Sequence, residues 1–158
     1  LLYRYTSHRN LPYHLYTNVQ LYAQEVASVA FSSDGKHLAI GILLGFARVC
    51  DTTNWREQAT LSGFLNAVSS VTFSPDSQRL VTGGTSPDDA VMLWDVDSWQ
   101  ELLTLQGSGT LFRVTAVSPY GNAVGTLSTD GFLHVWQAPS WAEINAAEAK
   151  EKAASKQP

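Results

Sequence analysis

Few residues of this chain have the types and spacings that catalysis or metal binding requires. The four histidines, His8, His14, His37 and His134, are not paired at the spacing of metal ligands. The single cysteine, Cys50, has no neighbouring His or Lys to stabilise a thiolate, which predicts a buried and unreactive thiol. The sequence also lacks a glycine-rich phosphate loop and a Gly-x-Ser-x-Gly elbow. We therefore expect no catalytic residues, no metal, no cofactor and no enzymatic activity of the chain itself.

One acidic pair, Asp88 and Asp89, follows Pro87 in a segment with the composition of a loop. Two adjacent carboxylates could bind a cation or a basic partner. A third carboxylate at EF-hand spacing is missing, so the pattern favours a solvated turn.

The residues that recur at regular intervals define structural elements instead. Three positions repeat every 42 to 44 residues: an apolar residue before a polar turn, a Cys or Trp ending a second apolar run, and a Trp five residues later. Together with the acidic turn residues, these repeat anchors are Phe31, Asp34, Cys50, Asp51, Trp55, Phe73, Asp76, Asp88, Trp94, Asp95, Trp99, Val117, Asp130, Trp136 and Trp141. A constant phase over three copies indicates a repeat protein.

Each copy is predicted to form short strands separated by turns rich in Ser, Pro, Asp and Gly. The third strand of each copy ends at the Cys or Trp anchor. The other predicted strands are 26–32, 38–41 and 57–61 in the first copy, 68–74, 80–83 and 101–105 in the second, and 112–118 and 123–126 in the third. Four short strands in about 40–45 residues are typical of a propeller blade. We therefore predict an all-β chain, a partial β-propeller of about three antiparallel blades.

The expected domain boundaries follow this period. Residues 21–63, 64–107 and 108–141 are the three blades, and residues 1–20 are a remnant of a preceding blade or an N-terminal strand. The third blade lacks a fourth strand, because a Ser-x-x-Glu capping box and an Ala-rich run predict a short C-terminal helix and tail over 142–158.

Three blades are too few to close a ring, which needs about four to eight. The first residue is Leu1 and not Met, so we expect the chain to be the C-terminal part of a longer protein. The alternative is self-association through the two apolar faces that three blades would leave open.

The Ser-Pro-Asp turn at 74–76 and the Trp94-Asp95 pair resemble those of WD-repeat β-propellers, and the likeness covers about residues 21–141. The third copy resembles the terminal blade of bacterial WD-repeat proteins. The resemblance implies a protein-binding scaffold that often follows a Ser/Thr kinase domain in the same polypeptide.

The chain departs from the family pattern at the Gly-His pair before the first strand of each blade, which is absent from all three copies. In the family, that His joins a hydrogen-bonded set with a turn Asp, a Ser or Thr and the Trp. Asp88 and Asp130 match the turn Asp, whereas Leu44 and Cys50 replace the Asp and the Trp in the first copy. A buried Asp without its His needs another hydrogen-bond donor.

Propeller partners usually dock on loops at one face, and these loops carry the residues that we expect to bind a protein or peptide. They are Leu43, Leu44, Phe46, Phe64, Leu65, Asn66, Phe112 and Arg113. The alternative is that Leu44 and Phe64 fill the space left by the absent His and Asp. We hypothesise a non-catalytic protein-interaction scaffold, or alternatively a regulatory region of a bacterial Ser/Thr kinase.

Composition and charge exclude two classes of partner, nucleic acid and the membrane interior. The formal net charge is −4, and residues 26–141 carry five basic against ten acidic residues, so nucleic-acid binding is not expected. The longest stretch free of charge and His, residues 58–75, is rich in Ser and Thr and too short to cross a bilayer, and no signal peptide is visible. One cysteine excludes an internal disulfide and agrees with a cytoplasmic location.

Overall fold

The computed structural model describes residues 25–139, and three antiparallel β-sheets account for nearly all the regular structure in this range. The first sheet contains β1 (Val26–Phe31), β2 (His37–Ile42), β3 (Phe46–Asp51) and β4 (Glu57–Ser62). The second contains β5 (Ser70–Phe73), β6 (Arg79–Gly83), β7 (Val91–Asp95) and β8 (Glu101–Leu105). The third contains β9 (Phe112–Val117), β10 (Ala123–Ser128) and β11 (Leu133–Gln137). A 3-10 turn, η1 (Pro87–Asp89), lies between β6 and β7.

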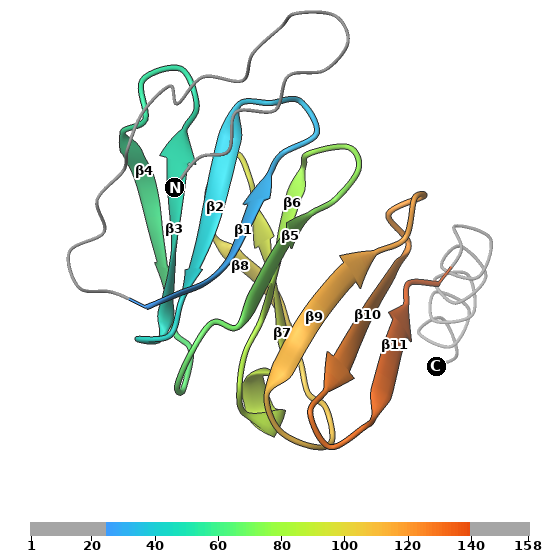
Figure 1. Ribbon diagram of the computed structural model, residues 1–158. Helices are drawn as coiled ribbons and strands as arrows, with labels where there is room; N and C mark the ends of the chain where they lie inside the picture. The colour runs from blue at the N-terminus through green and yellow to red at the C-terminus, as the bar shows by residue number, and fades with distance from the viewer. Residues whose placement is uncertain (1–24, 140–158) are drawn as a thin grey trace, which may run out of the picture.

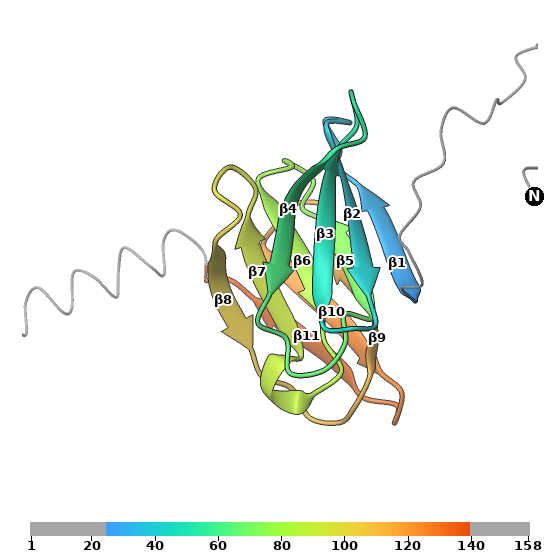
Figure 2. The same cartoon turned by 90° about the vertical axis from the view of Figure 1, so that its left-hand side faces the viewer.

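Each sheet is a meander in which consecutive strands pair with one another. The sheets stack face to face in chain order, with the second between the first and the third (Figure 1). The first strands of the sheets lie closest, because β1 contacts β5 and β5 contacts β9. Viewed from the side, the first sheet stands in front of the other two (Figure 2). This stack of blade-like sheets confirms the predicted all-β, partial-propeller fold.

The predicted strands agree with the observed ones to within about two residues at each end. The expected C-terminal helix, Trp141 and the N-terminal remnant lie outside the described residues. No described helix is long and apolar enough to span a membrane.

In the first and second sheets, the tight turn between the first two strands is held by a Ser and an Asp. In the first sheet the Ser32 hydroxyl donates to Asp34 Oδ1 at 2.6 Å and accepts from the His37 amide at 2.9 Å. In the second sheet Ser74 donates to Asp76 in the same way at 2.5 Å. These short polar side chains form hydrogen bonds that backbone groups would otherwise have to form within the turn. The Ser-x-Asp sequence is therefore a signature of this turn.

The turn after the third strand places a Trp in the left-handed region. Trp55 and Trp99 have φ of +60° and +56°, and each donates its amide N–H at 2.8 Å to the carbonyl of the Asp four residues earlier, Asp51 or Asp95. A bulky residue adopts this conformation only when its surroundings hold it there. Trp99 packs against the core between the first two sheets. This contact supplies such a constraint and explains the aromatic residue at the third anchor position.

The largest core cluster lies between the first and second sheets. The first sheet contributes small side chains such as Ala39, Ala47 and Val49, all fully buried, and the second sheet contributes Leu80 and Trp94. A smaller cluster, centred on three buried valines, joins the second sheet to the third.

The outer faces of the stack differ. On the first sheet the β2 and β3 side chains Ile40, Ile42 and Cys50 are at most 3% exposed, although Val29 and Phe31 on β1 are 60% exposed. On the third sheet the outward side chains are open to solvent throughout: Val114, Leu127, Leu133 and Val135 are 47–71% exposed. Only one of the two end faces is therefore as open as the sequence predicted.

Candidate functional site

Five connections meet at one end of the stack, which we call the loop end. They are the turns 43–45, 84–90 and 129–132 after each second strand, and the loops 63–69 and 106–111 that join one sheet to the next. In Figure 1 all five lie along the lower edge. An antiparallel meander requires this arrangement, since every second connection returns to the same end.

Exposed leucines from different sheets gather at the loop end. Leu44 and Leu65 are 64% and 62% exposed. The turn that carries Leu44 rests on the loop that carries Leu65, because a Cβ on Gly45 would lie 2.5 Å from the carbonyl oxygen of Asn66. Gly45 also has φ of +86°, so glycine is needed for its conformation as well as its size. Two of the groups expected to bind a partner are therefore adjacent in the structure.

A buried carboxylate positions the loop that carries Leu65. Asp89 is 4% exposed, and its two oxygens accept hydrogen bonds from the amide of Leu65 at 2.7 Å and the amide of Ser86 at 3.1 Å. These amides are the donors that a buried Asp needs in the absence of the family's His. The sequence pattern placed this role on Asp88, but Asp88 is exposed, and the buried carboxylate is one residue later.

The corresponding carboxylate in the third sheet is Asp130, which lies close to the loop between the second and third sheets. It accepts from the amide of Thr110 at 3.2 Å. Hydrogen bonds from the Ser128 side chain and the Thr110 amide hold the pKa of Asp130 below its usual range. Asp130 is therefore ionised at neutral pH and ties the loop 106–111 to the turn 129–132.

A hollow of about 380 Å³ opens beside these loops, where the first strands of the three sheets begin. We call it the loop-end hollow, and its lining residues are Ala27, Leu43, Ser69, Leu111 and Arg113. The Ser69 hydroxyl is already engaged, since it donates to the carbonyl of Phe112 at 2.6 Å. The walls are mainly apolar, and Arg113 supplies the charge.

Arg113 is exposed, and it is one of two described arginines, with Arg56, that form no ion pair among the described residues. Lys36, Arg48 and Arg79 each form an ion pair with a carboxylate. Within residues 25–139 the Arg113 guanidinium has neither an ion pair nor a hydrogen bond. It is therefore available to an anionic group from outside.

Leu111 has an unusual backbone for an apolar residue. Its φ is +54°, in the left-handed region that costs a side chain with a Cβ about 1 kcal/mol. Its side chain is 39% exposed and lines the loop-end hollow. Strained residues of this kind concentrate at binding sites.

The structure removes two aromatic residues from the expected binding surface. Phe112 is fully buried, because β9 has one extra residue, Arg113, opposite Leu127 and Ser128, and this bulge turns the Phe112 ring inward. Phe64 packs on Trp94 with ring centroids 5.8 Å apart and adds to the core cluster.

The remaining expected residues fall into three places. Phe46 packs against a small buried cluster on the outer face of the first sheet and has the Arg48 guanidinium 5.5 Å from its ring centroid. Asn66 is exposed beside Leu65. Leu43 and Arg113 line the loop-end hollow.

The sequence pattern missed the contributions of Ala27, Ser69 and Leu111 to this hollow. No local signal marks them, because they come from the starts of three different strands. Only the packing of the sheets brings them together.

The three copies differ at the Trp anchor. In the second sheet the Trp94 indole N–H donates to Thr82 Oγ1 at 3.0 Å, so this part of the family's hydrogen-bonded set is present. In the third sheet Trp136 stacks instead on His134, with ring centroids 5.6 Å apart. The His134 Nε2 accepts from the Ser108 amide at 2.9 Å, which gives this histidine a structural partner.

Cys50 replaces the Trp in the first sheet and is buried. Burial is the main cause that raises the pKa of its thiol, with a smaller contribution from the charge of Glu57. The predicted burial of this thiol is confirmed, and a buried, protonated thiol is a poor nucleophile. In the part of the chain that the structure describes, no group of three or more His, Cys, Asp or Glu side chains is placed to hold a metal.

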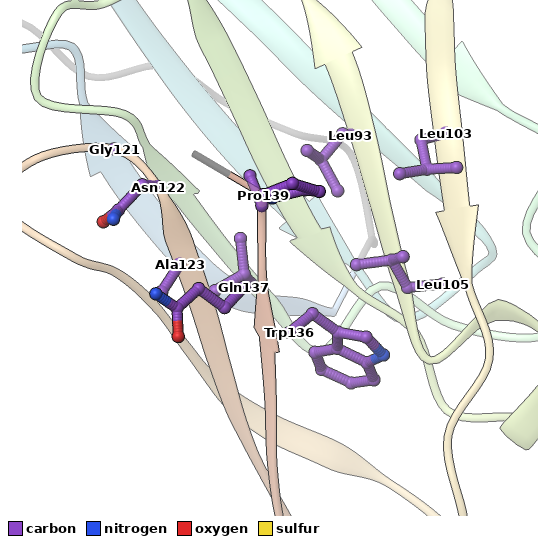
Figure 3. Close-up of a pocket in the computed structure, with 11 residues that line it drawn as sticks. Leu93, Leu103, Leu105, Gly121, Asn122, Ala123, Trp136, Gln137 and Pro139 are labelled. Carbon is purple, nitrogen blue, oxygen red and sulfur yellow. The ribbon is translucent and has the colours of Figure 1, made fainter. Parts of the chain in front are cut away.

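A second hollow, of about 300 Å³, lies between the second and third sheets towards the opposite end (Figure 3). Leu93, Leu103 and Leu105 line one side, and Trp136 and Pro139 line the other. At the other junction Trp99 packs against the core. The counterpart of Trp99 in the third copy is Trp141, outside the described residues, so we assign this hollow no ligand.

Comparison with known proteins agrees with this architecture. Residues 55–95 match the family model described as WD domain, G-beta repeat. The chain is 27% identical over 124 residues to Autophagy-related protein 16 of Arabidopsis thaliana, which covers 76% of this chain and 24% of the relative. It is 30% identical over 113 residues to Protein tipD of Dictyostelium discoideum, covering 71% and 18%. It is 35% identical over 79 residues to WD repeat-containing protein SL1-17 of Schistosoma mansoni, covering 50% and 25%.

The chain thus spans about a quarter or less of the length of these relatives. The relatives are eukaryotic, so the expected bacterial origin finds no support in them, and none of their names indicates a kinase. The matched segment runs from the end of the first sheet through the third strand of the second. Residues 55–95 therefore form a WD repeat, within an all-β stack of blade-like sheets that is similar to WD-repeat proteins.

Proposed function

We propose that this chain is a non-catalytic scaffold that binds a protein partner through its loop end. WD40 repeats generally mediate protein–protein interaction, and the family match is to such a repeat. The observation that carries the proposal is that Leu44 and Leu65 are exposed on two adjoining loops, which the close approach of Gly45 to Asn66 and the hydrogen bond of Asp89 to Leu65 hold in place. Exposed aliphatic side chains on loops that a rigid scaffold positions are typical of a docking surface.

The division of the sheets into blades 21–63, 64–107 and 108–141 is part of this proposal. Each blade would present one or two connections to the partner at the loop end. We propose no kinase-linked regulatory role, since no relative favours it. A cytoplasmic location stays a prediction, supported by the lone buried Cys50.

The test is affinity capture with the full chain, quantified by mass spectrometry, from an extract of the cells that make it. We expect the double variant Leu44→Ala/Leu65→Ala to retain about a tenth or less of the partner retained by the unsubstituted chain, since central docking residues contribute on the order of 2 kcal/mol or more. Both side chains are mainly exposed, so the double variant should keep its fold.

The matched control is Tyr120→Ala. Tyr120 is 92% exposed but belongs to the turn between β9 and β10, at the opposite end of the stack. Capture should survive this change. Equal capture by the double variant and the unsubstituted chain would place the docking surface elsewhere.

A further inference from the structure

We propose that the loop-end hollow binds an acidic side chain of the partner protein, paired with the Arg113 guanidinium, and seats an aliphatic neighbour of that side chain between Leu43 and Leu111. This inference rests on the proposed function, because it names the chemistry of the partner at the same end of the molecule. Three observations carry it.

The first observation is charge. Lys36, Arg48 and Arg79 form ion pairs, and of the two arginines that have no acidic partner among the described residues, Arg56 and Arg113, only Arg113 lines the loop-end hollow. The planar guanidinium can donate two parallel hydrogen bonds to one carboxylate, a geometry that a partner's Asp or Glu satisfies directly.

The second observation is the character of the walls. Ala27, Leu43 and Leu111 are apolar, and the Ser69 hydroxyl is committed to the carbonyl of Phe112. A ligand that offered only charge would leave these walls in contact with water. A volume of about 380 Å³ suits an acidic residue together with one aliphatic neighbour.

The third observation is the backbone of Leu111. Its amide donates to the carbonyl of Thr85 at 3.4 Å with φ of +54°, a conformation that glycine would adopt without strain. A leucine in this place presents a partly exposed side chain to the hollow. Since the side chain is partly exposed and its backbone is strained, a contribution to binding accounts for the leucine better than packing in the core does.

Nucleic acid is the other macromolecule that a free arginine could attract. The chain carries a net charge of −4, and Glu25, next to β1, holds the Leu43 amide at 3.0 Å through its carbonyl. A polyanion would be repelled by this acidic background, whereas a single carboxylate beside an apolar residue would not.

The experiment selects peptides from a random library displayed inside a loop of a carrier protein, so that no terminal carboxylate is free. Selection is run on the full chain and on Arg113→Gln. The best peptide is then synthesised with both ends blocked, and its affinity is measured by fluorescence anisotropy.

We expect the selected peptides to carry Asp or Glu next to Leu, Ile, Val or Met. Arg113→Gln should weaken binding by about tenfold or more, and Arg113→Lys should retain part of the affinity, because it keeps the charge and loses the bidentate geometry. Binding should also weaken as the salt concentration rises. Glu25→Gln should leave the affinity equal or higher.

Leu111→Gly provides a variant whose effects on folding and binding are expected to diverge. It removes one wall of the hollow while relieving the left-handed strain, so peptide affinity should fall while the thermal midpoint stays constant or rises. A fall in the midpoint would show that Leu111 serves folding and would remove it from the binding surface.

Four results would overturn the inference: no enriched peptide, no preference for acidic residues, equal affinity for Arg113→Gln, or tighter binding of an oligothymidylate than of the peptides. A different result would overturn the proposed function, namely equal capture of the cellular partner by the Leu44→Ala/Leu65→Ala variant and the unsubstituted chain. Leu44 and Leu65 do not line the hollow, so their double variant should still bind the peptide. If that variant loses the cellular partner and Arg113→Gln keeps it, the scaffold function stands and the acidic partner does not.

Discussion

The two junctions between the sheets are built from corresponding positions but are packed to different degrees. At the first junction Trp94 of the second sheet is 4% exposed within the largest core cluster. At the second junction Trp136, the same repeat position, is only partly buried and borders the hollow of about 300 Å³. One residue type at one repeat position is therefore a core residue in one copy and a cavity wall in the next.

The residues that face each indole explain the difference. Across the first junction the first sheet presents Ala39, Ala47, Val49 and Ala59. The corresponding residues of the second sheet, which face the third, are all larger: Val81, Val91, Leu93 and Leu103. Small facing residues leave room for the Trp94 indole in the core, whereas the larger ones leave less room for the Trp136 indole.

The largest effect is expected from truncating the two tryptophans. Trp94→Ala should lower the free energy of unfolding by about 3–5 kcal/mol, because it leaves a large cavity in a close-packed junction. Trp136→Ala should cost about 1–2 kcal/mol, since its ring is already partly solvated. Urea unfolding followed by circular dichroism measures both. Equal losses would mean that the two junctions are packed alike.

An intermediate effect is expected in the loops. Asp89→Ala should lower the free energy of unfolding by about 1–3 kcal/mol, because the amides of Leu65 and Ser86 would be left without their buried acceptor. Asp88→Ala is the adjacent control, and its exposed side chain should matter little. The same urea titration compares them, and an equal loss for both variants would contradict the structural role given to Asp89.

The smallest effect is expected in the dependence of stability on acidic pH. The Ser32 hydroxyl and then the Lys36 amide stabilise ionised Asp34 and lower its pKa to about 2, and a hydrogen bond from Ser74 lowers the pKa of Asp76. A carboxyl whose pKa is lower in the folded state stabilises the fold above its unfolded pKa, and this contribution disappears as pH falls through the folded value.

The thermal midpoint should therefore decline between about pH 4 and pH 2. Asp34→Asn should flatten part of this decline, while Asp97→Asn, at an exposed carboxylate in another turn, serves as the control. Circular dichroism melts at several pH values provide the measurement. A decline that Asp34→Asn leaves unchanged would show that other groups cause it.

The fold was predictable because its signals are local and periodic. The Ser-x-Asp turn recurs at Ser32 and Ser74. A Trp with a left-handed backbone conformation recurs after the third strand, at Trp55 and Trp99. Each feature depends on neighbours within a few residues of the chain. Their constant spacing predicted the strands and the sheet order.

The binding surface was less predictable because it depends on contacts between copies. The inward turn of Phe112 follows from a bulge at Arg113 within β9. Asp89, and not Asp88, is the buried carboxylate because of the 3-10 turn that begins after Ser86. The hollow around Arg113 requires three sheets to be in place. No local pattern encodes any of these.

The position of β11 at the edge of the third sheet has a consequence for how the protein behaves at high concentration. Among the described strands β11 pairs only with β10, which makes it the edge strand of its sheet within residues 25–139. Leu133 and Val135 stand on the same strand and are 71% and 63% exposed. An apolar edge strand is a template on which strands of other molecules can add, and such addition is a route to aggregation. A single lysine in place of Val135 would act as a gatekeeper there, keeping the sheet intact while making the edge a poor template.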